Sequence, residues 1–176
     1  MQWSQSLGGC TVGADLSTAG SANLRNAKEV TVTTNVGELD TATHERIKVL
    51  CAKGDQLAEA RAFEDAIAQY NEAWTLVPDP KNDWNASTWI LAAIADAAFL
   101  GGYKTSALEA LQYAMTCPGA VGNPFLHLRY GQVLFDRGEA DHAADELMRA
   151  YMGAGEEIFA AEDPRYLEFL KTRADL

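Results

Sequence analysis

From residue 43 onward, apolar residues return at every third or fourth position, the spacing that places them on one face of an α-helix. Clusters of Gly and Pro interrupt this pattern at residues 77–83, 101–102, 117–122, 138, 153–155 and 163–164. Asn85 or Ser87 is expected to cap the helix after the first break, and Asn123 to cap a helix that begins at Pro124. The pattern predicts an all-α fold of seven or eight helices.

Residues 1–42 differ from the rest because they lack this periodicity and are rich in Gly, Ser, Thr and Ala. Such a segment buries too little apolar surface to offset the entropy that it loses on ordering. Residues 30–36 alternate weakly, as a strand would, but the sequence offers no sheet for them to join. We therefore expect a mostly disordered tail over residues 1–42 and a helical domain over residues 43–176.

Small residues recur at a fixed interval in the helical part of the chain. In three places a small residue is followed twelve positions later by an alanine: Gly54 and Ala66, Ala95 and Ala107, Gly131 and Ala143. A large residue stands four positions after each of these alanines, namely Tyr70, Leu111 and Leu147. Two helices approach closely only where a side chain is nearly absent, so the interval predicts three helical hairpins.

This pattern resembles the tetratricopeptide repeat (TPR), a helical hairpin with a small residue in each helix and large residues around them. Flanking positions agree: Leu50 and Leu57, Leu91 and Ile94, Tyr130 and Leu134. Lys53, Ala98 and His127 depart from the family pattern, and the first linker is longer than usual. The resemblance covers residues 44–155 and implies a superhelix of three hairpins; an unrelated helical bundle is the alternative. Residues 156–171 are expected to cap the last hairpin.

Net charge limits the choice of partner. The chain has 14 Lys and Arg residues against 25 Asp and Glu residues, which gives a net charge of −11. Phosphate-rich and anionic surfaces repel such a protein, so neither nucleic acid nor a membrane is an expected partner. A protein partner of basic or mixed charge fits better.

The sequence contains no motif for catalysis. A nucleophile elbow, a phosphate loop, a dinucleotide-binding loop and a zinc-protease helix are all missing from it. The cysteines (Cys10, Cys51, Cys117) and histidines (His44, His127, His142) are not at metal-ligand spacing, and His127 is expected to lie between packed helices. We therefore expect a protein that is not an enzyme and needs no metal or cofactor. Free thiols and an N-terminus unlike a signal peptide favour a cytoplasmic location.

The TPR resemblance implies that the first helices of the hairpins line a concave, partner-binding groove. Alignment on Gly54, Ala95 and Gly131 gives the predicted partner-binding residues: Lys48, Asp55, Glu59, Trp89, Asp96, Phe99, Phe125, Leu128, Gln132, Phe135 and Asp136. Aromatic anchors bordered by charge are typical of protein-binding surfaces, although these aromatics can equally pack between repeats. Lys48 is the one base in this set against four acids, so an acidic C-terminal peptide is a poor candidate ligand.

Three further stretches, residues 82–91, 122–129 and 149–158, are similar to a group of small bacterial TPR proteins found beside polymorphic toxin genes. This resemblance implies an alternative function, that of an immunity protein that neutralises a cognate toxin. An acidic inhibitor of a basic toxin would gain from electrostatic steering. A general binding scaffold remains the principal prediction.

Overall fold

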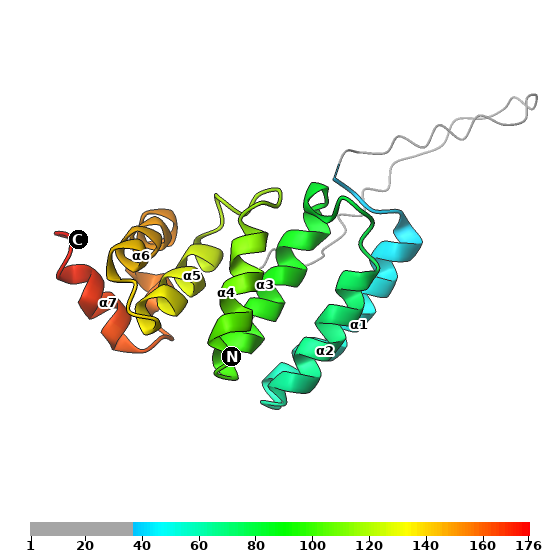
Figure 1. Cartoon of the computed structure of the whole chain (residues 1–176), viewed down its shortest axis with the longest axis horizontal. Helices are drawn as coiled ribbons and strands as arrows, with labels where there is room; N and C mark the ends of the chain where they lie inside the picture. Colours follow the sequence, from blue (N-terminus) through cyan, green and yellow to red (C-terminus); the bar gives the residue numbers. More distant parts are fainter. Residues whose placement is uncertain (1–36) are drawn as a thin grey trace, which may run out of the picture. The chain divides into compact units, whose positions relative to one another are not determined.

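The helices begin and end close to the breaks in the sequence (Figure 1). In the computed structural model, which describes residues 37–176, the elements in chain order are α1 (Thr41–Glu59), α2 (Phe63–Thr75), η2 (Lys81–Asp83), α3 (Asn85–Leu100), α4 (Lys104–Ala114), α5 (Pro124–Asp136), α6 (Ala140–Ala154), η3 (Glu156–Phe159) and α7 (Pro164–Lys171). The two η elements are short 3₁₀ turns. The predicted all-α class is thus confirmed for the described part of the chain, which contains no strand.

Of the two predicted helix caps, one is confirmed by the structure and the other is wrong. The Asn123 side chain accepts hydrogen bonds from the backbone N–H groups of Phe125 and Leu126, so this predicted cap is confirmed. The predicted cap of α3 is wrong, because Trp84 occupies the capping position and makes no side-chain cap. The Ser87 hydroxyl donates instead to the carbonyl of Lys81, which leaves it no role as a cap.

The first helix starts slightly before the predicted domain boundary at residue 43. Asp40 caps α1 by accepting hydrogen bonds from the N–H groups of Ala42 and Thr43, at 3.1 and 3.0 Å. The backbone N–H of Asn85 donates to the carbonyl of Gly37 at 2.9 Å, so residues 37–42 contact the helical domain. The rest of the predicted tail, including residues 30–36, lies outside the described residues.

Consecutive helices pack side by side as α1 with α2, α3 with α4, and α5 with α6 (Figure 1). Their closest approaches lie at the predicted small residues. A Cβ atom added to Gly54 would lie 2.4 Å from Cε1 of Tyr70, and one added to Gly131 would lie 2.6 Å from Cγ of Leu147. In these two hairpins the large residue four positions after the alanine fills the space that the glycine leaves open, as the interval predicts for the first and third pairs.

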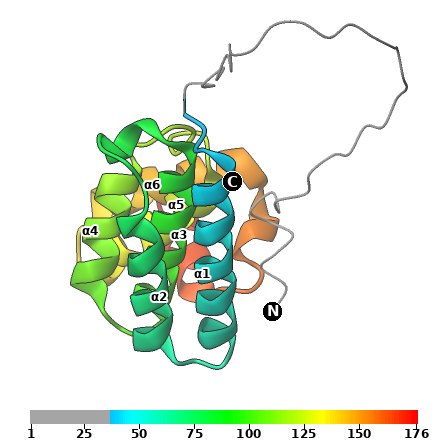
Figure 2. The ribbon, with the colours of Figure 1, turned by 90° about the vertical axis from the view of Figure 1, so that its right-hand side faces the viewer.

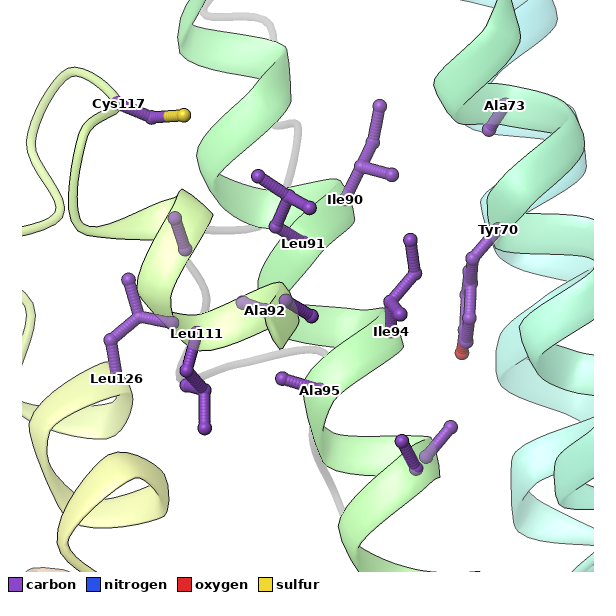
Figure 3. Packing of buried hydrophobic residues seen from close by; sticks show 14 of the residues in the cluster. Tyr70, Ala73, Ile90, Leu91, Ala92, Ile94, Ala95, Leu111, Cys117 and Leu126 are labelled. Atoms are coloured by element: carbon purple, nitrogen blue, oxygen red, sulfur yellow. The ribbon is translucent and has the colours of Figure 1, made fainter. Parts of the chain in front are cut away.

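Helix α3 is the centre of the core, because α2, α4 and α5 all contact it. Figure 3 shows Ile90 and Ile94 of α3 on the side of Tyr70 in α2, with Leu111 of α4 and Leu126 of α5 on the opposite side. Seen from the end of the domain, α2 and α4 lie on one side and α1 on the other (Figure 2). Helix α3 also contacts α1, so α1, α3 and α5 are neighbours in the domain.

The residues after α6 cover the last hairpin. Phe159 of η3 and Tyr166 and Leu170 of α7 form a buried cluster with Leu128, Leu147 and Ala150. Phe159, Tyr166 and Leu170 are thereby buried against the last pair of helices, the position expected for a capping segment. None of the described helices has both the length and the apolar content needed to cross a bilayer.

Ala107 provides a test of the packing register in the second hairpin. Its side chain is fully buried, so replacing it with Leu forces α3 and α4 apart and should lower the free energy of unfolding by about 1–3 kcal/mol. The adjacent Ser106 is exposed, and Ser106→Leu serves as a matched control that changes stability by about 0.5 kcal/mol or less. Urea denaturation followed by circular dichroism measures both. Equal stability of the two variants would show that the register is wrong.

Candidate protein-binding face

The predicted partner-binding residues all lie on α1, α3 and α5, and we call the surface that they form the first-helix face. On α1, the Lys48 ammonium pairs with Glu45 at 3.1 Å, and Asp55 accepts a hydrogen bond from the Tyr70 hydroxyl at 2.8 Å. Burial is the main cause that raises the pKa of Asp55. Glu59, one turn further along α1, is exposed. This helix therefore presents polar, mostly acidic groups to solvent.

On α3, Trp89 is the aromatic residue nearest the start of the helix. Its ring is half-buried against the core and meets the His44 ring of α1 edge-on, with 6.5 Å between ring centres. An aromatic ring that is partly covered and partly open can provide contact area to a partner at little entropic cost. Trp89, Lys48 and Asp55 make these contacts with residues of α1 and α2, and not with residues 156–176, which we call the C-terminal segment.

Arg129 of α5 joins α3, α5 and the C-terminal segment. Its Nη2 atom lies 2.7 Å from Oδ1 of Asp96, and its guanidinium carbon lies 4.6 Å from the ring centre of Phe99 and 5.4 Å from that of Phe125. The same guanidinium pairs with Glu162, which precedes α7, at 3.0 Å. Burial raises the pKa of Asp96 although the Arg129 charge opposes this shift. The Arg129 cation is thus held inside the domain by Asp96, Phe99 and Phe125, three residues that also belong to the first-helix face.

The structure corrects the prediction for the third hairpin, where the C-terminal segment covers four of the predicted residues. Leu128 and Gln132 are buried, and the Phe135 ring packs against the rings of Tyr166 and Phe169 at 5.6 and 4.8 Å. The Asp136 carboxylate, only 8% exposed, pairs with Lys104 and Arg165. Sequence register assigned these residues to the correct helix, but it could not show that the chain folds back over them.

Sequence reasoning missed Arg129, although a signal for it exists. In the repeat register Arg129 stands two positions before Gly131, where the first two repeats have Ala52 and Ala93. A charged residue at an otherwise small position, buried to 1% exposure in the structure, indicates a specific partner for its charge. Lys48 is the one base in the predicted set, and Arg129 is a second cation that lies beneath the face and not on its surface.

His127 lies between packed helices, as predicted. Its Nδ1 atom is 2.6 Å from Oε2 of Glu146, and its Nε2 atom is 2.7 Å from the carbonyl oxygen of Val121. Both of these neighbours accept hydrogen bonds, an arrangement that favours the protonated ring, in which both nitrogens donate. The hydrogen bond to Glu146 is the largest of the effects that raise the pKa of His127.

This pair predicts a pH dependence of stability. The pKa of His127 is higher in the folded chain than the value of about 6.5 in the unfolded chain. The charged ring therefore makes its full contribution to the free energy of unfolding below about pH 6.5. This contribution is lost as the pH rises through the pKa of the folded chain. We expect the stability difference between the wild type and Glu146→Gln to shrink as the pH rises above about 6.5. Urea denaturation across this range measures it. His142→Gln, at an exposed histidine, is the control, and a difference that grows with pH would contradict the assignment.

The described residues offer little to a small ligand or a metal. A shallow depression of about 260 Å³ between α5 and α6 is lined by Tyr130, Leu134, His142, Asp145, Glu146 and Arg149, none of which is a predicted partner-binding residue. Its volume is below the range usual for ligand sites. No group of three metal-ligating side chains occurs within residues 37–176. Burial raises the pKa of the Cys51 thiol to about 12, so this thiol is protonated at neutral pH.

Comparison with known proteins assigns neither a family nor a function to the chain. The chain matches no protein-family model, and a search of curated proteins gives no significant match.

Proposed function

We propose that the chain is a protein–protein interaction module with a TPR-like superhelix, and that its partner binds the first-helix face at α1 and α3. The observation that supports this proposal most is the contrast between the two ends of the face. Around Arg129 and Phe135 the side chains are covered by the chain's own C-terminal segment, whereas Trp89, Asp55 and Glu59 are half-buried or exposed. Trp89 contacts His44 near the start of α1, within about one turn of the Glu45–Lys48 ion pair, and an aromatic residue with charged groups around it is the usual composition of a binding hot spot and its rim.

The charge of the protein indicates the partner's chemistry. The net charge is −11, and Asp55 and Glu59 add acidic groups to the exposed part of the face. Opposite charge on a partner accelerates encounter and reduces binding to wrong partners. A protein of basic or mixed charge is therefore the partner that we propose, and its association rate should fall as salt is added.

Affinity purification from native lysate tests this proposal, with the recovered partner then titrated against purified variants. Trp89→Ala should weaken binding by about 2 kcal/mol, or roughly 30-fold, mostly through faster dissociation. Tyr113→Ala on α4 is the matched control, because Tyr113 is also partly exposed but lies outside the first-helix face. Melting curves establish that both variants are folded. A folded Trp89→Ala variant that binds like the wild type would contradict the proposed site.

An immunity protein is the second candidate, favoured by the same excess of acidic residues, since many toxins act on nucleic acid and carry basic surfaces. A toxin-like reading frame beside the gene and recovery of one stoichiometric toxin would distinguish this function from a general scaffold. The chain should then protect cells from that toxin when the two are expressed together. A partner without toxicity would reject this candidate and leave the scaffold function in place.

A further inference from the structure

Glu162 binds to the first-helix face in the way a ligand carboxylate would. Nη1 and Nη2 of Arg129 donate to its two oxygens at 3.0 and 3.3 Å, and Nε2 of Gln132 donates to the nearer oxygen at 2.9 Å. A guanidinium that contacts both oxygens of a carboxylate combines charge with a fixed orientation, and such contacts are among the stronger hydrogen bonds in proteins. Arg129 and Gln132 together thus supply three donors to a single carboxylate.

These donors are held in place by contacts that do not involve Glu162. Oε1 of Gln132 accepts a hydrogen bond from Nη1 of Arg129 at 2.6 Å, and the Asp96 carboxylate lies 2.7 Å from Nη2. The Phe99 and Phe125 rings lie on the guanidinium. Preorganised donors lose little entropy when a carboxylate binds, so the site keeps its shape if Glu162 leaves.

The segment that carries Glu162 is attached to the helical domain mainly through side chains. Among the described residues, the backbone hydrogen bonds of residues 156–176 all stay within that segment. It follows Gly155, whose φ of 70° and ψ of −167° suit glycine and allow the chain to turn after α6. Its buried anchors are Phe159, Tyr166 and Leu170. Side chains hold every helix of this domain, and what sets this segment apart is its small contact: α7 has eight residues and packs mainly on α6 and η3, so it can open without unfolding the hairpins.

We propose that Arg129 and Gln132 form a carboxylate-binding site, that Glu162 fills this site within the same chain, and that a partner segment of similar chemistry replaces residues 156–176. The chemistry is a carboxylate followed within one or two helical turns by aromatic residues, as in Glu162, Tyr166 and Phe169. Its carboxylate is acidic, so of the two partner charges proposed above this inference requires the mixed-charge one, a protein with basic groups elsewhere on its surface. The site extends the first-helix face, so this inference deepens the proposed function.

The tethered segment competes strongly with any free one, because a short linker gives an effective concentration in the millimolar range. Weakening the contact of Glu162 with Arg129 and Gln132 should therefore allow an added peptide to bind at this site. The probe is a fluorescein-labelled peptide of residues 156–176, titrated by anisotropy against the full chain. We expect the peptide to bind at least tenfold more tightly to the Glu162→Gln chain than to the wild type. A peptide that itself carries Glu162→Gln should bind at least tenfold more weakly than the unchanged peptide.

Glu168→Gln provides the matched control, since it makes the same change in charge at an exposed position of α7. This chain should bind the peptide no better than the wild type does. A folded Glu162→Gln chain that does not bind the peptide would overturn the proposal, and so would a stable dimer that exchanges the segment between two copies. The assay contains no partner protein, so its failure leaves the proposed partner site at α1 and α3 standing.

Hydrogen–deuterium exchange of the wild-type chain gives a second test that does not depend on a variant's folding. The amides of α7 should exchange through a local opening while those of α5 stay protected. If α7 and α5 exchange only together, the segment is a fixed part of the fold and the proposal fails.

Discussion

Replacing Arg129 with Met should lower the free energy of unfolding by about 3–5 kcal/mol, the cost of removing one partner from a buried ion pair. The guanidinium is 1% exposed and lies within 3.0 Å of both Asp96 and Glu162. Without it, two carboxylates face each other with no cation between them. Glu162 can reach solvent if its segment opens, but Asp96 lies on α3 with only 19% of its side chain exposed, so most of the loss should persist.

Arg137→Met is the control for this prediction. Arg137 is also in an ion pair, 3.0 Å from Glu139, but both side chains are well exposed. Exposed pairs contribute about 0–1 kcal/mol, so this variant should unfold almost like the wild type. Chemical denaturation of the two variants measures the difference. A loss below about 1 kcal/mol for Arg129→Met would show that the buried network does not stabilise the fold.

Replacing Gly131 with Leu should be comparably damaging. A Cβ atom at this position would lie 2.6 Å from Cγ and 2.9 Å from the backbone nitrogen of Leu147. The side chain could move aside, but the backbone can move only if α5 and α6 separate. We expect the free energy of unfolding to fall by about 3 kcal/mol or more, at the upper end of overpacking costs.

Gly122→Leu is the matched control for Gly131→Leu. A Cβ atom at Gly122 meets nothing within 4 Å, so the substitution should change stability by about 0.5 kcal/mol or less. Denaturation midpoints of the two variants provide the comparison. If Gly131→Leu unfolds at the same midpoint as Gly122→Leu, the two helices do not approach as closely as the structure shows.

Local physical chemistry explains which parts of the fold were predictable. The Asn123 cap and the contact of Gly131 with Leu147 each depend on residues that are close in sequence or at a fixed helical interval. The cap of α3 was mispredicted because Ser87 has a competing acceptor, the Lys81 carbonyl, that lies in the preceding turn. A propensity for capping says nothing about such competition.

The candidate site was predicted less well, because its composition depends on where the C-terminal segment folds. The repeat register placed Phe135 on α5 correctly, but the rings of Tyr166 and Phe169 that cover it come from α7. Arg129 and Glu162 are far apart in sequence, and only the turn at Gly155 brings them together. Sequence periodicity shows which residues share a face of one helix. The contact between Arg129 and Glu162 depends instead on where the chain changes direction between helices.

Site-specific photo-cross-linking tests the central claim, that a protein partner binds the first-helix face. A benzophenone amino acid is placed at Glu59, which is exposed on α1, or at Glu72, which is exposed on α2. Irradiation in native lysate should join a single protein to the chain that carries the probe at residue 59, and none to the chain that carries it at residue 72. Cross-linking of the partner at residue 72 and not at residue 59 would contradict the account.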